Sequence, residues 1–168
     1  MKLRYITLLA LVWTTSVVPG VHAQDSRTQN TRVADVLALL PAKDNKDADR
    51  LFRQLIGLND EGLAAITARV MPNGKEEGVA SRYAVSLLTH HSGTREEKAR
   101  IEKAYLDALE GASDTEVKAY FVDNLKVIGS NASVKSLSEI IVEQALAQQA
   151  ISALVSIGTT EARQALLS

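Results

Sequence analysis

The sequence predicts an all-α fold, a right-handed α-solenoid in which about eight or nine helices form antiparallel pairs. The composition favours helices, because the chain is 46% hydrophobic but only 4% aromatic and is rich in Ala and Leu. Apolar residues recur at the helical spacing of three and four positions, and no alternating strand pattern competes with them. The pattern also breaks at regular intervals, as it does in proteins built from repeated helix pairs. The alternative is an irregular all-α bundle whose breaks are evenly spaced by coincidence.

The breaks that define the repeat each contain a glycine. They fall at Ile56-Gly57, Ser92-Gly93, Ile128-Gly129 and Ile157-Gly158, and the glycines are 36, 36 and 29 residues apart. In the last two joints, two hydroxyl or amide residues follow the glycine, and a leucine stands eight residues beyond it. Hydroxyl and amide side chains cap helix N-termini, so each joint is expected to end one helix and begin the next.

The N-terminal part of the array is expected to contain three helices. The first starts at about Arg32 and stops at Pro41, because proline cannot continue a helix, and it covers the open end of the array. The second spans about 44–56. The third is capped by Asn59 and ends before the strong turn signal at 72–74.

A long helix is expected over 75–91, before the break at Gly93. Its apolar residues recur at helical spacing, so we expect them to face the core. They are Val79, Tyr83, Leu87 and Leu88.

Two capping boxes are expected to open the next two helices. Thr94 with Glu97 precedes a helix that Gly111 closes, and Ser113 with Glu116 precedes a helix that runs to about residue 128. In such a box the hydroxyl accepts from a free backbone N–H, and the carboxylate reaches back to the cap residue.

Three further helices complete the array. Ser130 or Asn131 caps a helix that runs to about residue 141, a full helix spans about 143–157, and Thr159 or Thr160 opens a final segment. That last segment starts a further unit without a polar terminal cap. We therefore expect self-association through this uncapped C-terminal end, a docked partner or a continuation of the chain.

Residues 1–23 have the pattern of a signal peptide. Lys2 and Arg4 precede an apolar run, a Pro-Gly break follows, and small residues precede a cleavage site after Ala23. An uncleaved membrane anchor is the alternative, although the apolar run is short for one. Polar residues 24–31 are expected to form a flexible leader, and residues 32–168 the helical repeat domain. The mature protein is then periplasmic or secreted, with no membrane span.

The composition excludes several classes of protein. The chain has no cysteine, which removes disulfides, thiol catalysis and zinc–thiolate sites. Its formal net charge of −1 provides no field that would attract nucleic acid.

The C-terminal part of the chain resembles HEAT repeats, in particular the short bacterial HEAT-like repeats of the phycobilin-lyase type. The segment 145–158 is similar to the second helix of such a unit, and the likeness is good over 113–168 and weaker over 44–111. The Asp-Pro expected after the glycine is replaced by Ser130-Asn131 and Thr159-Thr160, so the capping chemistry remains without the proline.

The resemblance implies that the helices near 44–56, 75–91, 113–128 and 143–157 line a concave face, where partners of this family usually bind. Polar residues expected to point outward there could bind a peptide or an acidic partner, although a simply solvated helix face is the alternative. These residues are Arg53, Arg82, Lys118, Lys126, Gln148 and Gln149.

No residue pattern predicts a catalytic, cofactor or metal site. His90 and His91 are neighbours on a helix and point in different directions, so they do not form a metal-binding pair. Glu76-Glu77 and Glu96-Glu97 lie in first helical turns, where negative charge offsets the helix dipole. A nucleophile elbow, a dinucleotide fingerprint and a P-loop are absent. The sequon 131–133 coincides with a helix cap.

These observations favour an exported, non-enzymatic scaffold that binds a protein or peptide partner. The alternative is the N-terminal or accessory helical region of a larger exported enzyme, such as one that processes glycans. The lyase-type resemblance also suggests chromophore attachment in the cytosol, against which the signal peptide argues.

Overall fold

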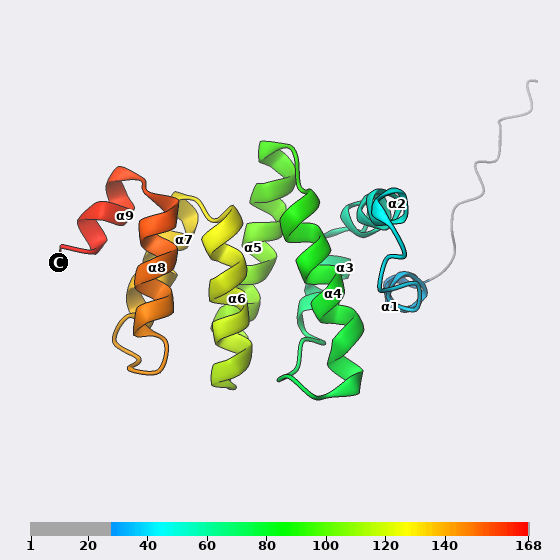
Figure 1. Cartoon of the computed structure of the whole chain (residues 1–168), viewed down its shortest axis with the longest axis horizontal. Helices are drawn as coiled ribbons and strands as arrows, with labels where there is room; N and C mark the ends of the chain where they lie inside the picture. The colour runs from blue at the N-terminus through cyan, green and yellow to red at the C-terminus, as the bar shows by residue number, and fades with distance from the viewer. Residues whose placement is uncertain (1–27, 168) are drawn as a thin grey trace, which may run out of the picture.

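The computed structural model describes residues 28–167, and this part of the chain consists of helices and connections without a strand (Figure 1). The all-α prediction and the expected number of helices are therefore confirmed for these residues. The expected signal peptide and most of the expected leader lie outside the described residues. The helices are α1 (Gln29–Leu37), α2 (Asn45–Ile56), α3 (Asp60–Thr67), α4 (Glu76–His91), α5 (Arg95–Gly111), α6 (Thr115–Ile128), α7 (Asn131–Ile140), α8 (Ala147–Ile157) and α9 (Thr160–Ala165).

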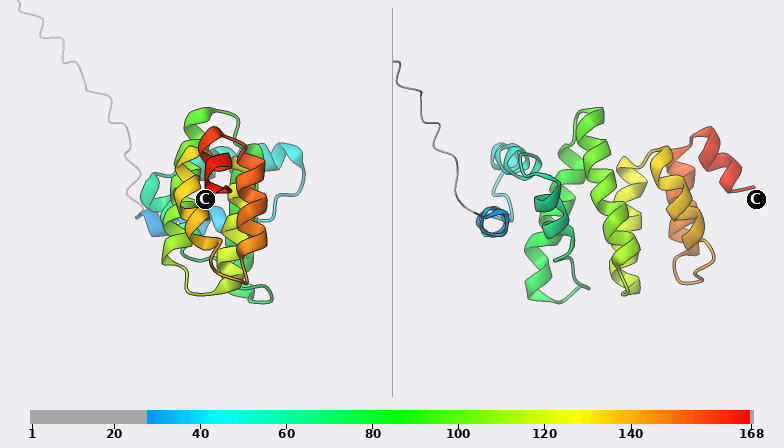
Figure 2. Two further views of the ribbon diagram at one scale, coloured as in Figure 1. Left: turned by 90° about the vertical axis from the view of Figure 1, so that its left-hand side faces the viewer. Right: turned by 180° about the vertical axis from the view of Figure 1, so that it is seen from behind.

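The helices pack in two layers. The even-numbered helices α2, α4, α6 and α8 contact one another in chain order, and so do the odd-numbered helices from α1 to α9. Figure 1 presents the even-numbered layer, and Figure 2 shows α3, α5 and α7 from behind. The first pair lies across the others, so that α1 and α2 are seen almost along their axes in Figure 1. The two ends of the described chain lie at opposite ends of the long axis.

Side-chain caps begin most of the helices, as their sequence indicates. The Asp44 carboxylate accepts the Asp47 N–H at 2.8 Å, and the Ser130 and Thr159 hydroxyls each accept an N–H at 3.2 Å. The Thr94–Glu97 capping box is present in full. Hydrogen bonds from the backbone N–H groups of Thr94 and Gly93 hold the pKa of the Glu97 carboxyl below its usual value.

The second expected capping box is wrong. The cap of α6 is Asp114 and not Ser113, since the Asp114 carboxylate accepts the N–H groups of Glu116 and Val117 at 2.9 and 3.1 Å. A carboxylate is a stronger acceptor than a hydroxyl at the positive end of a helix. The Glu116 side chain does not reach back to the cap, because it accepts the Asn73 N–H at 2.7 Å instead.

Two helix starts also differ from the prediction. The first helix begins at Gln29 with Thr28 as its cap, three residues before the expected start. The eighth begins only at Ala147, because the residues before it form a turn in which the N–H groups of Leu146 and Ala147 both bond to the Glu143 carbonyl. This turn buries the Leu146 side chain.

The expected core face of α4 is wrong for two of its four residues. Val79 and Tyr83 are 45% and 47% exposed, whereas Leu88 is buried. The face turned inward consists mainly of small residues, which let α4 approach its neighbours closely. It is formed by Gly78, Ser81, Ala84, Val85, Leu88 and Thr89. Gly78 packs directly against Met71, where a side chain would not fit.

The centre of the core is aromatic and contains a buried polar network. The rings of Tyr105 and Phe121 lie 5.7 Å apart, and both side chains are fully buried. The Tyr105 hydroxyl donates to the Val85 carbonyl at 2.8 Å, and the Thr89 hydroxyl donates to Asn124 Oδ1 at 2.7 Å. The network ties α4 to both α5 and α6, and burial raises the pKa of the Tyr105 hydroxyl.

The last two Ile-Gly joints need glycine for different reasons. Gly158 ends α8 with φ +63°, in the left-handed region that favours glycine. Gly129 has an ordinary backbone conformation, but a Cβ there would overlap the Leu125 carbonyl oxygen and lie 2.9 Å from Ile157 Cδ1. The joint at Gly129 is therefore required by close packing, and the joint at Gly158 by backbone geometry.

We predict that Gly129→Ala and Gly158→Ala each lower the free energy of unfolding by about 1–3 kcal/mol, through overpacking and left-handed strain respectively. Gly93→Ala is the control, because a Cβ at Gly93 meets no atom within 4 Å. Its effect should stay within about 0.5 kcal/mol in the same denaturant titration. Equal stability of all three variants would show that the joints do not require glycine.

Candidate partner-binding face

All six residues of the predicted partner face lie on even-numbered helices. Arg53 is on α2, Arg82 on α4, Lys118 and Lys126 on α6, and the two glutamines on α8. The structure divides them into residues that are engaged within the molecule and residues that are open to solvent.

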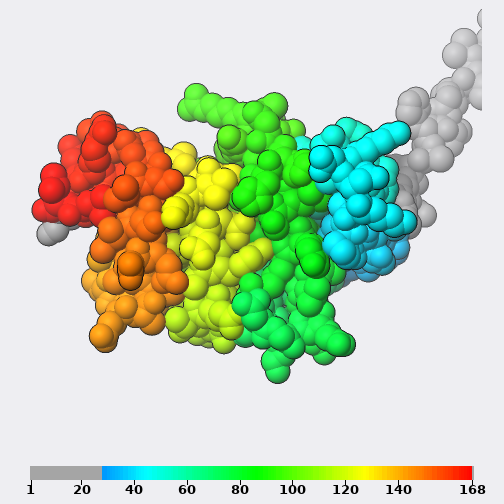
Figure 3. Space-filling model, in the orientation of Figure 1, coloured from blue at the N-terminus to red at the C-terminus, as the bar shows by residue number. Residues whose placement is uncertain are grey.

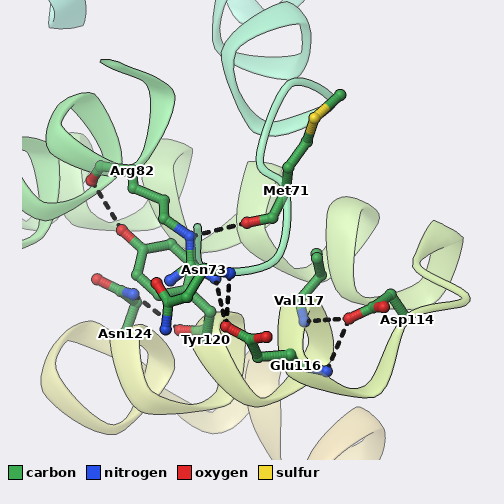
Figure 4. A network of polar contacts seen from close by, with 8 residues as sticks. All are labelled: Met71, Asn73, Arg82, Asp114, Glu116, Val117, Tyr120 and Asn124. Atoms are coloured by element: carbon green, nitrogen blue, oxygen red, sulfur yellow. Dashed lines mark hydrogen bonds and ion pairs between the residues drawn. The ribbon is translucent and has the colours of Figure 1, made fainter. Parts of the chain in front are cut away.

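Arg82 is engaged by three groups at once (Figure 4). Its Nε donates to the Met71 carbonyl at 2.8 Å, and its Nη2 lies 3.4 Å from Glu116 Oε1. The guanidinium also stacks over the Tyr120 ring, 4.3 Å from the centroid. Only 17% of the side chain is exposed. Arg82 thus fastens the segment between α3 and α4 to α6.

The groups around Arg82 complete a polar joint between α4 and α6. The Tyr120 hydroxyl donates to the Arg82 carbonyl at 2.7 Å, and Asn124 Nδ2 donates to the Tyr120 carbonyl at 2.8 Å. Burial raises the pKa of Tyr120 to about 12, although the nearby Arg82 cation opposes the shift. The hydroxyl therefore stays protonated and keeps donating across the neutral range.

Lys118 is engaged in a second joint, between α6 and the turn before α8. Its Nζ lies 2.8 Å from one Glu143 carboxylate oxygen and 3.1 Å from the other, and 22% of the side chain is exposed. The four remaining residues are more accessible: Arg53, Lys126 and Gln148 are exposed, and Gln149 is half-buried.

The even-numbered helices also carry exposed apolar side chains that the sequence does not predict there. They come from three successive even-numbered helices and are Val79 and Tyr83 of α4, Val127 of α6, and Ile151 and Val155 of α8. Val127 and Val155 are 54% and 62% exposed. We name these five residues the even-helix apolar face. Figure 3 presents the surface formed by these helices.

A hollow adjoins this face between α4 and the connection that precedes α2. It has a volume of about 260 Å³, and we name it the linker groove. Its lining is Leu40, Pro41, Ala42, Tyr83, Ser86, Leu87, His90 and His91. His91 Nδ1 lies 3.2 Å from an Asp49 carboxylate oxygen, and the His91 ring packs 6.2 Å from the Phe52 ring.

The most deeply buried carboxylate of the described chain lies elsewhere and joins two odd-numbered helices. Glu102 of α5 is 3% exposed and accepts the Ser130 N–H at 2.7 Å, the Ser130 hydroxyl at 2.8 Å and the Ser133 hydroxyl. It thereby satisfies free donors at the start of α7. The third residue of the sequon 131–133 is consequently buried.

Three further tests of function are a search for a metal site, a search for a membrane-spanning helix and comparison with known proteins. Within residues 28–167 no three His, Asp or Glu side chains converge in the way that a metal ion requires. None of the helices in this range is both long and apolar enough to cross a membrane. Comparison of the chain with protein-family models, with curated proteins and with solved structures finds no match. We therefore base the proposed function on the exposed residues of the even-numbered helices.

We predict that Arg82→Ala lowers the free energy of unfolding by about 1–2 kcal/mol, because a hydrogen bond and a cation–π contact are lost. Arg82→Lys should recover only part of this, since an ammonium does not reproduce the planar fork of the guanidinium. Arg53→Ala, on the exposed side of α2, is the matched control and should change stability by less than about 0.5 kcal/mol in thermal unfolding. Equal losses for the two alanine variants would show that Arg82 has no structural role.

We also predict that Glu102→Ala costs about 2–3 kcal/mol, because it leaves donors of Ser130 and Ser133 unpaired in a buried site. Glu110→Ala, an exposed position on the same helix, controls for the loss of a glutamate from α5. Urea titrations of both variants measure the difference. If Glu102→Ala is as stable as Glu110→Ala, the buried carboxylate does not hold α7 in place.

Proposed function

We propose that this protein is an exported, non-enzymatic scaffold of HEAT-like repeats that binds a protein partner through its even-helix apolar face. Five apolar side chains from α4, α6 and α8 remain exposed on one layer of the stack. Apolar patches on folded proteins mark interaction surfaces, because leaving them in water is unfavourable.

A right-handed α-solenoid is the architecture that we propose for the two layers. Contact between every second helix supports it, because a solenoid repeats one helix pair along a single axis. The polar residues around the apolar face, among them Lys126 and Gln148, are suited to the wet rim of an interface. The signal-peptide pattern of residues 1–23 supports a periplasmic or secreted location.

We predict that Val127→Asp combined with Val155→Asp weakens partner binding about tenfold or more without unfolding the protein. Affinity capture from the envelope fraction of the source cells, followed by mass spectrometry, compares this variant with the wild type. Buried charges at an interface core remove at least about 1–2 kcal/mol, so recovery of the partner should fall about tenfold or more.

Val142→Asp is the matched control, because Val142 is 86% exposed and lies in the turn before α8, outside the apolar face. It should retain the partner. Undiminished capture by the double variant would contradict the proposal. So would the absence of any partner together with turnover of a substrate by the purified protein.

A further inference from the structure

The linker groove has the size and lining of a site for an apolar side chain. Its volume of about 260 Å³ is below the range of about 300–1,000 Å³ that is usual for sites of drug-sized ligands and cofactors. Leu40, Pro41 and Leu87 provide apolar walls, and Tyr83 presents an aromatic ring that is 47% exposed. The groove therefore suits one or two apolar side chains of a larger partner.

A second hollow, of about 350 Å³, is lined by residues that come next in the chain, and its lining contains more cations than carboxylates. Ala42 lines the linker groove and its neighbour Lys43 lines this hollow, so consecutive residues connect the two. The lining of the second hollow, which we name the cationic hollow, is Lys43, Asp44, Lys46, Asp47, Arg50 and Arg53. Four cationic side chains thus face only two carboxylates.

Both carboxylates are already occupied. Asp44 is the cap of α2, and Asp47 accepts from Arg50 Nε at 3.1 Å and from the Lys43 N–H at 3.1 Å. Lys46 and Arg53 are exposed and form no ion pair within residues 28–167. The uncompensated charge of the cationic hollow is therefore positive and directed to solvent.

We infer that the linker groove and the cationic hollow together bind an extended acidic peptide segment of the protein partner. An apolar side chain of the segment enters the groove, and its carboxylates lie against Lys46 and Arg53. The inference rests on the proposed function and names the chemistry of the partner. A nucleic acid fits less well, because the few cations of the hollow can neutralise only a few backbone phosphates. A phosphate backbone also has no apolar group that would fill the linker groove.

Fluorescence anisotropy with the full chain tests the inference. The probe is a labelled octapeptide of two leucines flanked on each side by three aspartates. Two matched peptides replace either the aspartates with lysines or the leucines with serines. We expect saturable binding of the probe that weakens as salt is added, and at least tenfold weaker binding of both matched peptides.

Variants locate the site. Lys46→Glu with Arg53→Glu should weaken probe binding at least tenfold, and Tyr83→Ser should weaken it severalfold. Arg95→Glu with Lys98→Glu is the control, because it reverses two exposed cations on α5. Its binding of the probe should equal that of the wild type. Circular dichroism of each variant checks that the helices remain folded.

Several results would overturn the inference. One is the absence of saturable probe binding, and another is binding of the lysine or serine peptide as tightly as the probe. A third is that Arg95→Glu with Lys98→Glu weakens probe binding as much as Lys46→Glu with Arg53→Glu does. A fourth is full displacement of the probe by a short polyphosphate that carries the same total charge as the probe. The last result would identify a general anion patch. If the Val127→Asp, Val155→Asp variant loses its captured partner while Lys46→Glu, Arg53→Glu keeps it, this inference fails and the proposed function stands. A partner that Lys46→Glu, Arg53→Glu loses but the Val127→Asp, Val155→Asp variant keeps would instead support the peptide site and contradict binding through the even-helix apolar face.

Discussion

Each helix stacks on the second helix before and after it in the chain, and this stacking determines which side chains are buried. It leaves an inner helix such as α6 between two members of its own layer and against the other layer. Phe121, Val122 and Leu125 of α6 are accordingly fully buried. Only one side of such an inner helix then remains in water, and the residues on that side determine how the helix can interact with a partner.

Buried polar joints hold this stack in one register. Thr89, Tyr105 and Asn124 connect three helices in the core, and Glu102 connects α5 to the start of α7. Burying such polar groups is costly unless every donor has a hydrogen-bond partner. A shift of one helix along another would break these hydrogen bonds, so the groups favour a single arrangement of the helices. The joint around Arg82 acts in the same way at the surface. These joints use Arg82 and Lys118 within the molecule, whereas Val127, Ile151 and Val155 stay exposed on the same layer.

The sequence predicts the elements better than it predicts their faces. The joints at Gly129 and Gly158 and the capping box at Thr94 are local features, and the structure confirms them. The apolar period of α4 does not predict its orientation, because close packing of Gly78 and Ala84 outweighs the larger side chains. Likewise, an arginine on a helix gives no sign of whether its partners lie in another helix. The sequence predicts that Arg82 and Lys118 face a partner, yet each bonds to residues at least 11 positions away in the chain.

We propose that the even-helix apolar face contacts the partner. Hydroxyl-radical footprinting of the protein, alone and in complex with its captured partner, measures this directly. We predict that Tyr83, Val127, Ile151 and Val155 become protected on binding, whereas Met71 and Val142, which are exposed outside this face, do not. Protection of Met71 and Val142 with unchanged labelling of the even-helix apolar face would show that the partner binds elsewhere on the protein.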